Sequence, residues 1–348
     1  MITITDVKNA YDILFYDPLI LNILFMADSQ GLGDFLYKVY PLLYFTRLVK
    51  PKAKITLCYY GHNNAALKII SLLDFHTINS NDLENQSIYD YTYVEGGMQA
   101  LPPSKYLYKL NDKAQVVYKF TEYFLRITDF RKKIMAHFAG IFYNPSDVFK
   151  IKNSIVVSIG SITENSGINN NLYYQNRLYE VIRQDRTNTF VLVGFTTELV
   201  SENLKLLLMS SNVINLIDKT NNILDLINIL YHSKFVIVRN TGTSHLAGLC
   251  NCNLIFLYNN TRLSHQVMLL LDYRENAIEE YVTESDHIFY TEKWSPMADK
   301  YISIVEYKLL NKKYNLSVQD IISSYINGCS YISTKTQVQI FKNFNFYF

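Results

Sequence analysis

Short apolar runs alternate with segments of helical periodicity along most of this chain. In the second half the runs are brief and almost free of polar residues, and they lie at 154–159, 190–194, 213–217, 235–239 and 253–258. Strands that are apolar on both faces are typical of parallel sheets, because helices cover each side of such a sheet. Helices are expected between them at 172–184, 198–209, 222–231 and 244–250. This pattern predicts a parallel α/β fold.

The first half carries the same alternation. Strands are expected at 19–26, 54–60 and 89–94, and helices at 35–48, with a kink at Pro41, and at 63–73. The aromatic and cationic stretch 105–143 is predicted to be helical, and the strongest turn signal, Asn144-Pro145-Ser146-Asp147, follows it. The sequence therefore predicts two Rossmann-like domains, 1–148 and 149–348. The second includes a helix at 317–326 in a tail that could pack back on the N-terminal domain.

The composition is that of a globular protein. The chain has 348 residues, of which 49% are apolar and 18% charged, enough for two domains of ordinary size. Its net charge of +2 gives no general attraction to nucleic acid. One local basic cluster, Arg47, Lys50, Lys52 and Lys54, is either a solvated helix end and loop or a contact with an anionic acceptor or a membrane surface.

Several classes of site find no support. The cysteines, Cys58, Cys250, Cys252 and Cys329, form neither a disulfide framework nor paired CxxC units, so a reducing cytoplasm is expected. No leader pattern is seen, and polar residues interrupt the apolar stretch 13–27 too often for a membrane-spanning helix. The sequence lacks GxGxxG after the first strand, GxxxxGK[ST], GxSxG and HExxH. The seven histidines lack ligand spacing, so neither a metal nor another cofactor is expected.

A glycine-containing turn, Gly31-Leu32-Gly33-Asp34, lies after the first strongly apolar strand and before a helix. Glycines let the backbone approach a ligand closely, and the carboxyl edge of a parallel sheet is where open α/β folds place their sites. Gly31 and Gly33 are therefore expected in an acceptor-side loop. Asp34 is either an acid that caps the helix or a general base that accepts a proton from an acceptor hydroxyl.

A second turn of this kind, Asn240-Thr241-Gly242-Thr243-Ser244-His245, follows a later strand. Free N–H and hydroxyl groups at a helix N-terminus suit an anion, most naturally a diphosphate, and Gly242 leaves room for it. Arg239, at the strand end, is a reasonable phosphate partner. In the alternative, Asn240 is only a helix cap, Gly242 a turn glycine and His245 a packed core histidine. Two such turns suggest one cleft shared by two domains.

Two further positions are assigned to the same donor side. Glu198 follows the strand 190–194 and is either a helix N-terminal acid or an acceptor of hydrogen bonds from sugar or ribose hydroxyls. The long polar loop 158–171, which contains Ser161, could cap a nucleotide or could be a surface loop.

Both turns resemble motifs of a known family. Residues from Ile223 to Ala247 are similar to the pattern L..L..L...A.lvi..DTG..HLA, and Ser29–Asp34 followed by Pro41 is similar to SLGD…LP. The chain thus resembles, over about residues 20–260, the bacterial lipopolysaccharide heptosyltransferases and their relatives, inverting glycosyltransferases of family 9. The resemblance implies a GT-B fold, in which two Rossmann-like parallel-sheet domains face a central cleft. The first domain would bind the acceptor and the second the nucleotide sugar.

The resemblance also implies residue roles. Asp34 matches the catalytic base, Thr241, Gly242 and His245 match positions around the donor diphosphate, and Glu198 falls near an acid that contacts the nucleoside. Two departures are evident, because Asn240 stands where the family has aspartate and the loop 158–171 lacks the usual lysine, for which Arg239 or Arg177 could substitute.

The expected function is a metal-independent inverting glycosyltransferase that uses a nucleotide-diphosphate sugar. A cytoplasmic enzyme of this kind would act on a glycan, lipid-linked or protein acceptor, with room for peripheral contact with the inner membrane. Two alternatives stay open. One is a nucleotide-sugar or glycan binder that has lost catalysis, and the other is a GT-B-shaped nucleotide-sugar epimerase or hydrolase.

Overall fold

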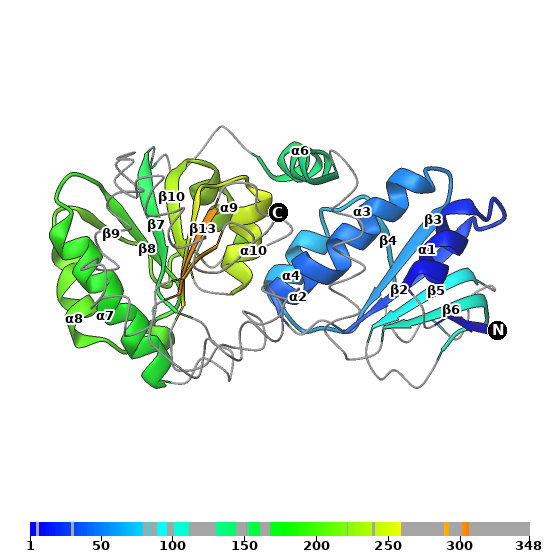
Figure 1. The fold of residues 1–348 in the computed structure, drawn as a ribbon, viewed down its shortest axis with the longest axis horizontal. Helices are drawn as coiled ribbons and strands as arrows, with labels where there is room; N and C mark the ends of the chain where they lie inside the picture. Colours follow the sequence, from blue (N-terminus) through cyan, green and yellow to red (C-terminus); the bar gives the residue numbers. More distant parts are fainter. Residues whose placement is uncertain are drawn as a thin grey trace. The chain divides into compact units, whose positions relative to one another are not determined.

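The computed structural model describes residues 1–4, 7–28, 31–78, 83, 89–95, 101–110, 130–143, 151, 153–160, 168–220, 222–238, 241–258, 289–291 and 301–305. The chain divides into two compact units, Met1–Ile141 and Phe142–Phe348. Each is an α/β unit built on a mainly parallel sheet, so the predicted fold class is confirmed (Figure 1). The predicted boundary at 148 and 149 and the predicted helix 317–326 lie outside the described residues.

The first unit contains a six-stranded sheet in which every pairing is parallel, with the order β1-β6-β5-β2-β3-β4. The strands are β1 (Ile2–Ile4), β2 (Asn22–Ala27), β3 (Lys54–Tyr59), β4 (His76–Ile78), β5 (Tyr89–Glu95) and β6 (Ser104–Leu110). The helices are α1 (Val7–Tyr16), α2 (Leu32–Asp34), α3 (Tyr40–Val49), α4 (Asn64–Ile70) and α6 (Phe130–Phe142). Residues 23–27 of β2 are buried, as the apolar run predicts for an inner strand.

The predicted helix over 105–143 is wrong for its first residues. Residues 104–110 form the strand β6, which pairs with β1 and β5. The far end of the stretch is helical as predicted, in α6, and residues 111–129 lie outside the described residues. Leu107 and Tyr108 are buried in the sheet, so sheet packing decides the conformation of a segment that has no strong local preference. The strands β1 and β4 and the helix α1 are also present although the sequence did not predict them.

The helix predicted at 35–48 contains a π-helical turn just before Pro41. A π-helical turn, η1 (Phe35–Val39), joins α2 to α3, and Pro41 lies in the first turn of α3. The Tyr40 N–H donates to the Phe35 carbonyl, five residues earlier. A proline lacks an N–H and crowds the carbonyl four residues before it, and a π-helical turn is one way in which a helix accommodates such a break.

Aromatic side chains hold α6 against α3 within the first unit. The Tyr40 hydroxyl hydrogen-bonds His137 Nδ1 at 2.9 Å, and the Tyr44 hydroxyl donates to the Lys133 carbonyl at 3.1 Å. The rings of Tyr44 and His137 lie 4.5 Å apart, and Phe138 contacts Tyr40 edge-on. Burial lowers the pKa of His137, so its neutral form is favoured at this contact.

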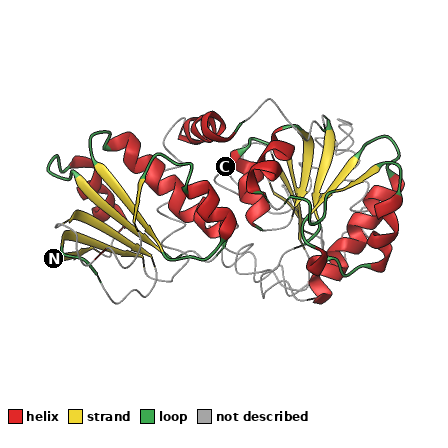
Figure 2. Cartoon of the chain, turned by 180° about the vertical axis from the view of Figure 1, so that it is seen from behind, coloured by secondary structure: helices red, strands yellow, loops and turns green. Residues whose placement is uncertain are grey.

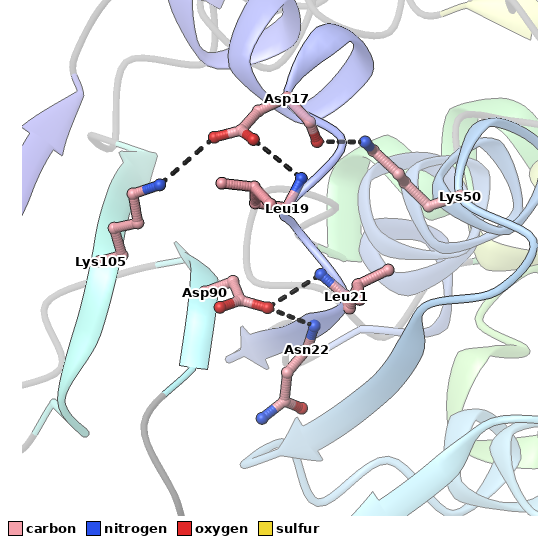
Figure 3. Close-up of polar contacts among 7 residues, drawn as sticks. All are labelled: Asp17, Leu19, Leu21, Asn22, Lys50, Asp90 and Lys105. Carbon is pink, nitrogen blue, oxygen red and sulfur yellow. Dashed lines mark hydrogen bonds and ion pairs between the residues drawn. The ribbon is translucent and has the colours of Figure 1, made fainter.

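The loop that leads into β2 is fixed by Asp17 (Figure 3). Its carboxylate accepts the Leu19 N–H at 2.9 Å and pairs with Lys105 at 3.5 Å. Its carbonyl accepts a hydrogen bond from Lys50 Nζ at 2.5 Å. Lys50 of the basic cluster therefore has a local structural partner.

The first residues of β2 are held by Asp90, whose Oδ2 accepts the Leu21 and Asn22 N–H groups at 2.8 Å each (Figure 3).

Arg47, another member of the basic cluster, donates to the Ala53 carbonyl at 3.0 Å. The interpretation of the basic cluster as a helix end and loop is thus supported for Arg47 and Lys50, whereas Lys52 and Lys54 are exposed.

The second unit contains a seven-stranded sheet with the order β12-β13-β11-β10-β7-β8-β9, parallel except for β12. The strands are β7 (Ser154–Ser158), β8 (Phe190–Val193), β9 (Val213–Asn215), β10 (Ser233–Val238), β11 (Leu254–Tyr258), β12 (Phe289–Thr291) and β13 (Tyr301–Val305). The helices are α7 (Ile168–Gln184), α8 (Glu202–Leu206), α9 (Ile223–Tyr231) and α10 (Gly242–Leu249), with 3₁₀ turns η4 (Thr196–Glu198) and η5 (Leu207–Met209).

Helices cover both faces of this second sheet. In Figures 1 and 2, α7 and α8 lie on one face and α9 and α10 on the other. The core under α7 is formed by apolar side chains of the helix and the strands, among them Ile155, Val157, Leu178, Ile182 and Leu192. The alternation predicted for 154–258 is confirmed, while β12 and β13 were not predicted.

The structure describes Cys58, Cys250 and Cys252, which are reduced and buried. Burial raises the pKa of the Cys252 thiol to about 12 and raises that of Cys250 as well. Both thiols therefore stay protonated near neutral pH. Cys329 lies outside the described residues.

Candidate functional site

Asp34 lies where the sequence predicts it, in the first helical turn after the buried strand β2. Gly31 precedes the turn in an extended conformation and accepts the Phe35 N–H at 3.1 Å. A Cβ built on Gly31 would lie 3.5 Å from Asp34 Oδ2, so the carboxylate folds back over the turn. Asp34 is exposed and makes no capping hydrogen bond to the π-helical turn η1. Gly33 lies beside it in α2 and is partly exposed.

Three residues that the sequence did not single out surround this position. The pKa of Tyr59 is raised to about 12, first by burial and then by the negative charges of Glu95, Asp34 and Asp28. Tyr59 ends β3, Glu95 ends β5, and Asp28 follows β2, so all three lie at the carboxyl edge of neighbouring strands. The only sequence signal for these three residues is that they lie near the ends of predicted strands. That they lie close together depends on the strand order, which the sequence does not show.

At the second turn, Thr241 precedes α10 in an extended conformation, and Gly242 is the first helical residue. The Ser244 hydroxyl closes the turn, since it donates to the Thr241 carbonyl at 2.7 Å and accepts the Thr241 N–H at 3.2 Å. Thr241 Oγ1 is buried and has no hydrogen-bond partner among the described residues. Thr243 and His245 are partly exposed, while Arg239 and Asn240 lie outside the described residues. The turn thus offers a hydroxyl and helix N–H groups at one strand end.

Glu198 has a structural role in its own turn. Its Oε2 accepts the Phe195 N–H at 2.9 Å, and the residue is only 7% exposed. Burial raises the pKa of Glu198, the Phe195 hydrogen bond opposes that change, and the Asp218 charge adds to it. This geometry supports the helix-terminal interpretation, and a contact of Glu198 with a sugar stays a prediction.

Gln175, which the sequence did not single out, is a positioning residue for the carboxyl edge of β7 and β8. It is fully buried, and its Nε2 donates to the carbonyls of Ile159 at 2.8 Å and Glu198 at 2.6 Å. Its Oε1 accepts the N–H groups of Val200 and Ser201 at 2.9 Å each. One amide therefore ties the end of β7 to the turn after β8.

Within the second unit the predicted donor residues share one edge. The strands β10, β7 and β8 are neighbours, so Thr241, Ile159 and Glu198 follow three adjacent carboxyl ends, the usual place for a site in an open α/β sheet. Ser161 lies outside the described residues, and so does the side chain of Arg177. Asp34 belongs to the other unit, and a cleft shared by the two edges stays a prediction.

The described part of the chain contains no group of three or more His, Cys, Asp and Glu side chains that could hold a metal ion. None of its helices combines the length and the apolar character needed to cross a membrane.

No family model and no curated protein matches the chain. Among solved structures, the chain is similar to heptosyltransferase WaaC of E. coli with ADP, with 15% identity, a TM-score of 0.44 and coverage of 70% of this chain and 88% of that one. It is also similar to a glycosyl transferase of family 9 from Veillonella parvula DSM 2008, with 13% identity, a TM-score of 0.46 and coverage of 70% and 83%. A third similar structure is S. aureus MnaA with UDP, with 11% identity, a TM-score of 0.41 and coverage of 80% and 93%.

Proposed function

We propose that this protein is an inverting glycosyltransferase that moves a sugar from a nucleotide-diphosphate sugar to an acceptor hydroxyl. The observation that carries the proposal is the placement of Asp34, an exposed carboxylate in the first helical turn beyond an inner strand of the sheet. A carboxylate there can accept a proton from a bound hydroxyl, which is what a general base must do.

The reaction requires no covalent bond to the protein. Asp34 would take the proton of the acceptor hydroxyl, and the acceptor oxygen would attack the anomeric carbon from the face opposite the diphosphate. The carbon–oxygen bond to the diphosphate breaks, and the nucleoside diphosphate leaves with the bonding electrons. Because attack and departure occur on opposite faces, the anomeric configuration is inverted.

The diphosphate would bind at the N-terminus of α10. Its free N–H groups and the Thr241 hydroxyl are suited to phosphate oxygens, and Gly242 carries no side chain at the first helical position. Arg239, Asn240, Thr243, His245 and Ser161 complete the proposed donor site on sequence grounds. Stabilising charge on the leaving group in this way is a large part of catalysis in group transfer.

The proposal includes the family-like features that the two glycine-containing turns suggest. These are a GT-B arrangement, a cytoplasmic enzyme, no metal or other cofactor, and a glycan, lipid-linked or protein acceptor. The exposed Lys52 and Lys54 carry positive charges that could contact an anionic membrane surface.

A second candidate is a nucleotide-sugar binder without catalysis. It is favoured by Asn240 in place of the family's aspartate and by the absence of lysine from the loop 158–171. It predicts donor binding without transfer, whereas the epimerase or hydrolase alternative predicts turnover of the nucleotide sugar without an acceptor.

Donor binding is tested by thermal unfolding of the protein with ADP-, GDP-, UDP- and CDP-linked sugars, each with EDTA and with magnesium. A ligand at one hundred times its Kd stabilises the folded state by about 2.7 kcal/mol, or about 5–10 °C for a unit of this size. The proposal predicts such a rise with one base, without metal. It should shrink in Thr241→Val and persist in Thr189→Val, an exposed threonine at the opposite edge of the sheet. No rise with any donor would refute the assigned donor site.

A further inference from the structure

Tyr59 and Glu95 end strands on either side of β2. In the register of the parallel sheet, Tyr59 lies opposite Ala27, and Val94 lies opposite Met26, so Glu95 comes level with Ala27 on the other side. Residues in one row of a parallel sheet point to the same face, and the outer strands of such a trio are about 10 Å apart. Because alanine fills little space between them, the long side chains of Tyr59 and Glu95 can approach each other above it.

The ring of Tyr59 also contacts the turn that carries Asp34. Its centroid lies 5.8 Å from that of Phe35, with an interplanar angle of 73°, an edge-to-face contact. Phe35 is fully buried and directly follows Asp34 in the chain. The tyrosine ring therefore fixes the helical turn from which Asp34 projects.

The Tyr59 hydroxyl lies within the electrostatic reach of three carboxylates. Burial and the charges of Glu95, Asp34 and Asp28 raise the pKa of Tyr59 to about 12. The phenol thus keeps its proton at physiological pH, so its hydroxyl has a hydrogen that it can donate. Carboxylates that share a site repel one another, and a neutral donor between them reduces that cost.

We propose that Tyr59 is the positioning residue for Asp34: its ring packs on Phe35 and so holds the turn that carries Asp34, and its hydroxyl donates a hydrogen bond to the Asp34 carboxylate. The proposal rests on the proposed role of Asp34 as the base. It assigns to one residue both the placement of the base and the supply of a proton donor beside it.

The kinetic test uses Tyr59→Phe, which keeps the ring contact with Phe35 and removes only the hydroxyl. We expect kcat to fall about tenfold, as for loss of a hydrogen bond to a charged group, with KM for the donor unchanged. The acidic limb of the kcat profile should move to higher pH, since the carboxylates lose their donor. Tyr60→Phe is the matched control, because Tyr60 packs on the opposite face of the sheet, against the cluster that contains Met26 and Cys58. A Tyr59→Phe profile that coincides with the wild-type profile would overturn the proposal.

A second test needs neither donor nor turnover. In protein labelled with [¹³Cζ]tyrosine, the resonance absent from Tyr59→Phe identifies Tyr59, and its titration is followed to pH 11. We expect Tyr59 to stay protonated at that pH and to ionise at lower pH in Asp34→Asn and in Glu95→Gln. Asp74→Asn, at an exposed position before β4, should leave its titration unchanged.

The two tests separate the two claims. A Tyr59 that ionises near pH 10 in the wild type, or that does not respond to Asp34→Asn, overturns the positioning role. A protein that shows this coupled titration but transfers no sugar with any donor refutes the proposed function, while the contact between Tyr59 and the Asp34 carboxylate remains established.

Discussion

Gly194 is the residue of the second unit at which both the backbone conformation and the neighbouring atoms require glycine. It directly follows β8 and has a φ of +137°, a conformation that residues with a side chain rarely adopt. A Cβ at this position would lie 2.7 Å from Glu198 Oε2 and 2.7 Å from Ile159 Cγ1. Both neighbours are buried, so neither has free space into which to move.

The expected cost of Gly194→Ala follows from these two terms. Holding a non-glycine residue in such a conformation costs about 1–3 kcal/mol, and forcing an extra methyl group into a packed core costs about 1–3 kcal/mol. We therefore expect the free energy of unfolding of the second unit to fall by about 4 kcal/mol, or its Tm by about 8–16 °C. Differential scanning calorimetry measures this directly and separates the transitions of the two units.

The matched control is Gly140→Ala in α6, because a Cβ built on Gly140 meets nothing within 4 Å. Replacing glycine by alanine in an exposed helix stabilises it by about 0.5–1 kcal/mol, so this variant should keep or raise the Tm. If Gly194→Ala lowered stability by less than about 1 kcal/mol, the close packing of Glu198 and Ile159 against this glycine would be wrong.

Two further predictions concern buried polar contacts. Gln175→Leu should destabilise the second unit by about 3–5 kcal/mol, since it leaves the N–H groups of Val200 and Ser201 and two carbonyls without a partner. The control is Gln184→Leu at an exposed position of the same helix. Equal Tm values for the two variants would contradict a stabilising role of the Gln175 hydrogen bonds. The pKa of His137 is lowered by burial, so the unfolded chain binds more protons there and the first unit should lose stability as the pH falls below about 6.5. Urea unfolding at pH 5 and pH 7.5 measures this, and His137→Gln should weaken the dependence; a first unit more stable at pH 5 would show that the sign is wrong.

The strands that carry the two glycine-containing turns could be predicted from the sequence because they are apolar on both faces and bounded by turns. Asp34 follows from this pattern, since its place depends only on where β2 ends and the next helix begins. The prediction of a helix is wrong for residues 105–110, because their mixed aromatic and cationic side chains match a helix as well as a strand, and only pairing with β1 and β5 decides between them.

Other parts of the site depend on contacts between distant residues. Tyr59 and Glu95 lie near Asp34 because the strand order places β3 and β5 on either side of β2, which no local pattern encodes. Gln175 makes its hydrogen bonds to residues 16 to 26 positions away along the chain. In the sequence, Gln175 looks like any other polar residue of an amphipathic helix, so no local pattern indicates that its side chain is buried.

The most direct test of the account is sugar transfer by the wild type and by Asp34→Asn, with the donor that stabilises the protein. The account predicts that Asp34→Asn lowers kcat by about a hundredfold or more, as for loss of a general base, and keeps the donor-induced rise in Tm. Asp74→Asn should transfer at the wild-type rate. Transfer by Asp34→Asn at the wild-type rate would contradict the account, because another group would then have to take the acceptor proton.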